Sequence, residues 1–101
     1  MIQINYTNAE IIDNSPLVLV SFWATWCSAC KVQNKMLEGM DQLPTNLLLA
    51  SIDVGENRFL AQKYSVANIP DLLLFKKGKA IHRFGGLIST SQILHQLNNL
   101  S

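Results

Sequence analysis

The sequence has few of the residues that usually mark a metal-binding or nucleic-acid-binding protein. It contains two cysteines and two histidines, and seven acidic side chains nearly balance its eight lysines and arginines. Structural zinc sites take four Cys or His ligands, whereas His82 and His95 lie thirteen residues apart outside any motif. Nucleic-acid binding draws on many uncompensated basic groups. We therefore expect no nucleic-acid partner and no zinc site within one chain, although two chains could share a metal through two cysteine pairs.

Long hydrophobic runs are also missing. The longest, LVLV at 17–20 and LLLA at 47–50, are far too short to cross a bilayer. The first residues carry acids where a secretory signal would carry basic side chains. These features predict a cytoplasmic protein that does not insert into a membrane, and we expect it to be a monomer.

Length and composition indicate one globular unit. The chain has 101 residues, of which 49% are hydrophobic and 15% are charged. A chain of this size can bury a modest core without a disulfide to support it. We therefore expect a single domain over residues 1–101.

Hydrophobic patterning predicts strands that alternate with helices and end in a hairpin and a helix. The β-branched and apolar run LVLVSFW at 17–23 is typical of a central strand covered on both faces. The expected strands are 2–5, 17–23, 46–54, 72–75 and 80–84, and the expected helices are 8–14, a segment from 28 onward, 58–64 and a segment that follows Ser89 or Thr90. This order predicts an α/β fold, a mixed sheet with helices on both sides.

Three finer expectations concern the helices. Thr7 followed by Glu10 is a capping-box pattern for the first helix. Val32, Met36 and Met40 recur every four residues, with Leu37 and Leu43 beside them, which is the spacing of an apolar helix face. Side chains of the third helix that are available for packing are Phe59, Leu60 and Tyr64.

The two cysteines lie where a predicted strand ends and a helix begins. Cys27 and Cys30 could form a metal clip, a fixed crosslink or a pair that exchanges disulfides. A crosslink that closes so short a loop contributes little stability, and a cytoplasmic setting would tend to reduce it. Free N–H groups at the helix start stabilise a thiolate and should lower the pKa of Cys27. The position therefore favours exchange, with Cys27 as nucleophile and Cys30, one turn later, as resolving thiol.

The segment VSFWATWCSACK resembles the active-site segment of the thioredoxin family. The matching residues are Phe22, Trp23, Ala24, Trp26, Cys27, Cys30 and Lys31. The similarity continues through SIDV at 51–54, NIPDLLLFKKGK at 68–79 and FGGL at 84–87. It implies the thioredoxin fold, with a sheet of about five strands in the order 1-3-2-4-5, four flanking helices and a cis peptide before Pro70.

The same resemblance implies a function. Thioredoxins exchange thiols and disulfides with protein substrates and need no bound cofactor, because the electrons reside in the dithiol itself. A thioredoxin-reductase-like donor would then recycle the oxidised form. The implied docking surface consists of Trp26, Ile69, Pro70, Gly85 and Gly86. For the two glycines, a plain turn between a strand and a helix is the alternative explanation.

Several positions depart from the family pattern. Ser21 stands where thioredoxins usually have a buried aspartate, and Leu49 where many have its lysine partner. Because serine cannot accept the proton of the resolving thiol, we expect slower resolution by Cys30. Ser28 and Ala29 replace the usual Gly-Pro, which predicts a less reducing couple.

Asp71 replaces a usual threonine. A carboxylate at this position would either disfavour the thiolate of Cys27 or lie solvated at the start of a strand. Two rival functions also remain at this point: a binding module built on the thioredoxin fold, weakly active or inactive in redox chemistry, and a disulfide oxidase or isomerase.

Overall fold

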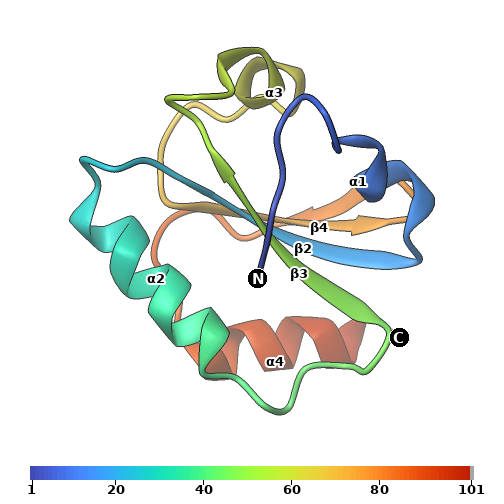
Figure 1. The fold of residues 1–101 in the computed structure, drawn as a ribbon. Helices are drawn as coiled ribbons and strands as arrows, with labels where there is room; N and C mark the ends of the chain where they lie inside the picture. Colours follow the sequence, from blue (N-terminus) through green and yellow to red (C-terminus); the bar gives the residue numbers. More distant parts are fainter. Residues whose placement is uncertain (101) are drawn as a thin grey trace.

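A computed structural model of the protein describes residues 1–100, which form a five-stranded mixed sheet between two layers of helices (Figure 1). The sheet order is β1-β3-β2-β4-β5. The strands are β1 (Ile2–Gln3), β2 (Leu17–Trp23), β3 (Leu47–Asp53), β4 (Asp71–Lys76) and β5 (Lys79–Arg83). The helices are α1 (Glu10–Asn14), α2 (Ser28–Glu38), α3 (Arg58–Lys63) and α4 (Thr90–Asn99). The predicted fold class, strand order and number of helices are confirmed.

The central strand β2 organises the sheet. It pairs in parallel with β3 and antiparallel with β4, so Ser21 lies between Ser51 and Leu72 in the register. Its five inner residues are buried, as the unbroken apolar run predicts for a strand covered on both faces. Because β2 ends at Trp23, the cysteines follow at the carboxyl edge of the sheet.

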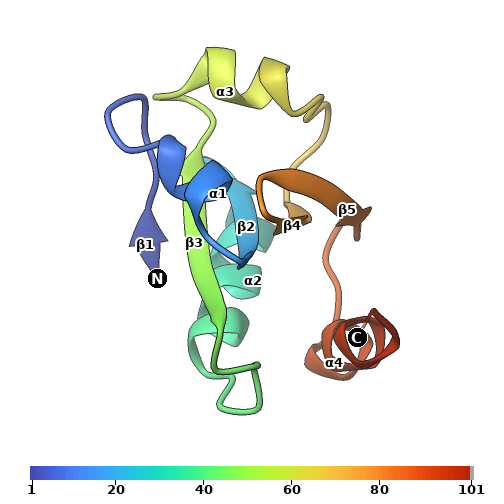
Figure 2. The same cartoon turned by 90° about the vertical axis from the view of Figure 1, so that its right-hand side faces the viewer.

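Each face of the sheet packs its own core. On one face, α1 and α3 cover a cluster that contains Ile12, Leu60 and Phe75. On the other, α2 and α4 cover a cluster that contains Leu37, Leu74 and Ile93. Figure 2 shows α3 and α4 at opposite ends of the view, with the sheet between them. Residues that alternate along β4 therefore face different helices.

The hairpin between β4 and β5 turns at Lys77 and Gly78, as the sequence predicts. Both residues have positive φ, 50° and 82°, which suits a two-residue turn joining twisted strands. A Cβ at Gly78 would lie 2.9 Å from Asp13 Oδ1. The turn therefore needs glycine at this position both for its backbone angle and for space.

The two predicted caps have opposite outcomes. Ser89 caps α4 and forms a full capping box with Gln92, which confirms the first of the two proposed cap residues. The Thr7–Glu10 capping box is wrong, since α1 begins at Glu10 after Ala9 and has no side-chain cap. The Thr7 hydroxyl and amide instead donate to Asn5 Oδ1. A local turn around Asn5 therefore competes successfully for the side chain that would cap the helix.

Two packing expectations are also wrong. Val32 is 51% exposed and Phe59 is 74% exposed, although the sequence pattern predicts that both pack inward. The buried residues of α2 are Cys30, Gln33 and Leu37, which shifts the inner face by one position. Because these residues are spaced three and four apart, they share the one face of the helix that packs on the sheet. No helix among residues 1–100 combines the length and apolar character needed to cross a membrane.

Candidate active site

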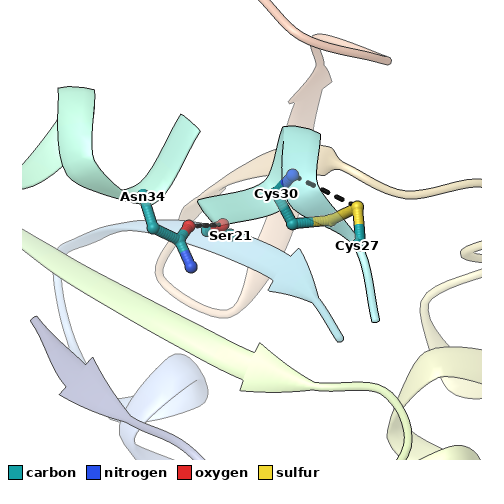
Figure 3. The surroundings of a disulfide bond; sticks show 4 residues. All are labelled: Ser21, Cys27, Cys30 and Asn34. Carbon is teal, nitrogen blue, oxygen red and sulfur yellow. Dashed lines mark hydrogen bonds between the residues drawn. A yellow bond between two sulfur atoms is a disulfide. The ribbon is translucent and has the colours of Figure 1, made fainter. Parts of the chain in front are cut away.

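The two cysteines are joined by a disulfide at the amino end of α2. Cys27 is the N-cap residue, and the backbone N–H of Cys30 donates to Cys27 Sγ at 3.1 Å (Figure 3). The sulfur therefore occupies the place where a Ser or Asp oxygen usually satisfies the first free amides of a helix. When the disulfide is reduced, the same amide can stabilise a thiolate on Cys27.

Access differs sharply between the two cysteines. Cys27 is half-buried, whereas Cys30 is fully buried with 0% of its surface exposed. An incoming disulfide can therefore reach Cys27 and not Cys30. This asymmetry suits a pair in which the first thiol attacks the substrate and the second resolves the intermediate within the same molecule.

Trp26, which precedes Cys27 in the chain, comes together with Ile69. They line one hollow of about 350 Å³, and the Trp26 side chain is 72% exposed. The indole passes close to the chain at Gly55, where a Cβ would lie 3.1 Å from the ring. Two of the predicted docking residues therefore line one open hollow, together with Arg58 and Gln62.

The other three predicted docking residues are linked by the backbone. The Ile69–Pro70 peptide is cis, as the resemblance implies. The N–H of Gly86 donates to the carbonyl of Pro70 at 3.1 Å. Gly85 and Gly86 are exposed, with φ of 67° and 84°, and a Cβ added at either would have nothing within 4 Å. Pro70 itself is buried, so it supports this surface more than it contributes to it.

Ser21 lies on β2 beneath α2, where the resemblance places the family's aspartate. It is fully buried, and its hydroxyl donates to Asn34 Oδ1 (Figure 3). Asn34 follows Cys30 by one helical turn, so both face the same way on α2. Leu49 packs against the apolar cluster on this face of the sheet. Neutral Ser21 and Leu49 thus stand where the family usually has a carboxylate and an amine, and Ser21 pairs instead with Asn34.

Gln33 is a second buried polar residue of α2. Its side chain is 0% exposed, and Oε1 accepts the backbone N–H of Ile88 at 2.8 Å. This bond connects the helix that carries Cys30 to the segment that follows Gly85 and Gly86. Its Nε2 group is buried without a protein partner among the residues described.

Asp71 lies on the opposite side of the sheet from α2. It precedes Leu72, which packs under α2 and α4, so its own side chain faces the α3 side. It is 4% exposed and forms an ion pair with Arg83, which also donates to the carbonyl of Tyr64. The solvated alternative for Asp71 is therefore wrong, and a paired cation compensates its charge. Its influence on Cys27 remains a prediction.

The residues between the cysteines lie in the first turn of α2. Ser28 is exposed and Ala29 is half-buried. Among residues 1–100, no group of three or more His, Cys, Asp or Glu could hold a metal ion. The site therefore consists of a dithiol pair, an aromatic neighbour and a neutral polar layer beneath.

A half-buried sulfur at a helix N-cap, bonded to a buried one three residues later, defines a thiol–disulfide exchange site. The Thioredoxin family model matches residues 2–99. A thioredoxin of Mycobacterium bovis is 35% identical over 92 residues, which cover 90% of this chain and 79% of that protein. A bifunctional thioredoxin reductase/thioredoxin of Mycobacterium leprae is 33% identical over 93 residues, 91% of this chain and 20% of that protein.

Solved structures agree with these sequence relatives. A mutant thioredoxin of Halobacterium salinarum superposes with a TM-score of 0.86 at 28% identity, over 97% of this chain and 88% of that chain. The chain belongs to the thioredoxin family. It is a thiol–disulfide oxidoreductase whose redox centre is the Cys27–Cys30 pair.

Sequence reasoning missed three polar contacts around the site. Gln33 and Asn34 carried a usable signal, because they follow Cys30 by three and four residues on a predicted helix and so share its buried face. Arg83 follows Lys76, Lys77 and Lys79 of the hairpin. Charged side chains at a hairpin tip are usually solvated, so the sequence gives no sign that Arg83 forms an ion pair. Its pairing with Asp71 depends on the register of β4 and β5, which the sequence alone does not fix.

Proposed function

We propose that this protein reduces disulfides in other proteins. The observation that carries the proposal is the contrast between Cys27, half-buried beside the exposed Trp26, and Cys30, which is completely buried. A large substrate can place its disulfide on the open surface beside the exposed Trp26. The buried second thiol then acts only after a mixed disulfide has formed.

The reaction consists of two exchanges. The Cys27 thiolate attacks one sulfur of the substrate disulfide, a Cys27–substrate disulfide forms, and the other substrate sulfur leaves as a thiolate. Cys30 then loses its proton and attacks Cys27 Sγ, which forms the Cys27–Cys30 disulfide and releases the second substrate thiolate. Two electrons pass from the dithiol to the substrate, and the released thiolates take up protons. The structure describes the oxidised state at the end of this sequence.

The donor that restores the dithiol is proposed to be a thioredoxin reductase. The support is the Mycobacterium leprae relative, whose name joins a thioredoxin reductase and a thioredoxin in one protein. The dithiol itself carries the electrons, so the proposal includes no bound cofactor. This role suits a reducing compartment such as the cytoplasm, because such a setting keeps the pair in its dithiol form. We propose that the protein acts there as a monomer.

Turnover of a protein disulfide tests the proposal. Reduced insulin chains precipitate, so light scattering in the presence of dithiothreitol follows the reaction. Wild type should accelerate precipitation, and Cys30→Ser should lose most of the acceleration because it cannot release the mixed disulfide. Equal rates with and without the wild-type protein would contradict the proposal and favour a binding module.

A further inference from the structure

Two aromatic side chains stand exposed and in contact at the start of α3. Tyr6 is 51% exposed and Phe59 is 74% exposed, and their ring centroids lie 6.5 Å apart at an angle of 54°. The backbone N–H of Phe59 donates to the Tyr6 hydroxyl at 2.9 Å, which fixes the segment after β1 against α3. Figure 2 shows this segment beside the start of α3. The pair is held in place, yet its apolar surface faces outward.

This pair adjoins the hollow beside Trp26. Tyr6, Phe59 and Gly55 line a hollow of about 280 Å³, and a Cβ at Gly55 would lie 3.1 Å from the Trp26 ring. The hollow shares two lining residues with the neighbouring one beside Trp26, namely Arg58 and Gln62. We call the surface formed by Trp26, Gly55, Phe59 and Tyr6 the aromatic strip.

The aromatic strip concentrates exposed apolar surface. Trp26 and Phe59 are the two most exposed large apolar side chains among the residues described. Single exposed apolar residues are common on protein surfaces, whereas exposed aromatic side chains in contact, such as Tyr6 and Phe59, more often mark an interaction site. Because the strip begins at Trp26, beside the nucleophile, its occupant is the molecule that brings a disulfide to Cys27.

We propose that the aromatic strip binds the substrate polypeptide on one side of its reacting cysteine. The strip then favours substrates with an aromatic or branched aliphatic side chain a few residues from that cysteine. Ring faces such as those of Tyr6 and Phe59 pack well against apolar and aromatic groups. This inference rests on the proposed reduction of protein disulfides and names a class of substrate for it.

Peptide substrates can separate this inference from the proposed function. Each peptide carries one disulfide and a single phenylalanine, which is moved through successive positions on either side of a cysteine. A peptide with serine in place of phenylalanine is the reference. Wild type should reduce one or two phenylalanine peptides with a KM about threefold to tenfold below that of the reference, with similar kcat.

Phe59→Ser and Tyr6→Ser are the informative variants. Phe59 is the more exposed of the two, so Phe59→Ser should fold normally, whereas Tyr6→Ser also removes the hydroxyl that accepts the Phe59 N–H. A thermal melt measures the stability of both variants. Each should abolish the preference for phenylalanine and leave the reduction of a small polar disulfide such as oxidised glutathione unchanged. Ile81→Ser is the matched control, because Ile81 is 37% exposed on β5 outside both hollows. It should retain the preference.

The outcomes distinguish the two claims. If wild type reduces all peptides with equal KM, or if Phe59→Ser retains the preference, the inference is wrong and the proposed function stands. If wild type reduces no peptide, the proposed function fails and the inference fails with it. Self-association that Phe59→Ser abolishes would assign the strip to a second copy of this chain and also overturn the inference.

Discussion

Gln33 Oε1 accepts the backbone N–H of Ile88 at 2.8 Å, which connects two segments 55 residues apart in the sequence. One segment is the helix that carries Cys30. The other follows Gly85 and Gly86, and the backbone of Gly86 is bonded to Pro70. This one side chain thus joins the redox helix to the glycines proposed to contact substrate.

Gln33→Met should loosen this connection with little effect on stability. It removes one hydrogen bond and also one buried amide group without a protein partner, so the free energy of unfolding should change by about 1 kcal/mol or less. The amide of Ile88 should exchange with solvent faster, and KM for a protein disulfide should rise severalfold with no change for a small disulfide. Exposed Gln42 gives the control, Gln42→Met. If the Ile88 amide exchanges faster while KM stays unchanged, the Gln33–Ile88 hydrogen bond has no role in substrate docking.

Ser21→Asp should accelerate resolution by Cys30. The buried hydroxyl of Ser21 cannot take a proton at neutral pH, whereas a carboxylate there can accept one from the resolving thiol. Asn34 can rotate its amide to donate to the new carboxylate, since its Oδ1 now accepts from Ser21. The measurement is the rate of insulin reduction in variants shown to be folded by circular dichroism.

Ser21→Asn is the matched control for that substitution, because it has a similar size and no group that accepts a proton. It should turn over no faster than wild type. A folded Ser21→Asp protein that also turns over no faster would show that the carboxylate has no role here.

Ala29→Pro should make the couple more reducing. Ala29 lies in the first turn of α2, where backbone N–H groups stabilise the Cys27 thiolate of the reduced form. Proline removes one of those groups, so the oxidised form gains relative stability. The potential should fall by about 30 mV, a tenfold change in the two-electron equilibrium, measured by equilibration with glutathione. Ala29→Gly keeps the N–H and should change the potential less; an equal fall in both would exclude the N–H as the cause.

The Asp71–Arg83 ion pair should be required for stability. Arg83→Met leaves a buried carboxylate without its cation and should lower the free energy of unfolding by about 2 kcal/mol, since the arginine is partly exposed and the pair partly screened. The double variant Asp71→Asn/Arg83→Met should recover much of this loss. Urea denaturation of the single and double variants measures the coupling, and strictly additive effects would mean that the pair contributes nothing specific.

The sequence predicted the fold and the redox pair well because both leave local signals. Buried runs such as LVLVSFW identify strands, and the Lys77–Gly78 turn needs the positive φ that glycine allows. The cysteines could be placed at a helix start from the strand that precedes them and the helical spacing that follows. These features depend on neighbouring residues and can therefore be read without knowledge of the packing.

One error arose from competition within a local turn, and the others arose where tertiary contacts decide. The Thr7 cap fails because Asn5 offers a nearer partner, and Phe59 stays exposed because Tyr6 packs beside it outside the core. The partners of Asp71 and Gln33 lie 12 and 55 residues away, so only the strand register and the arrangement of helices bring them together. The Ser21–Asn34 pair under the cysteines likewise joins residues that only the packing of α2 on the sheet brings together.

A mixed disulfide on Cys27 would test the central claim most directly. Cys30→Ser and Cys27→Ser proteins are each incubated with a protein disulfide, and intact mass and peptide mapping locate any adduct. The division of roles predicts a stable substrate adduct on Cys27 in Cys30→Ser, and little or no adduct in Cys27→Ser because Cys30 is buried. An adduct that forms equally well on Cys30, or none in Cys30→Ser, would contradict it.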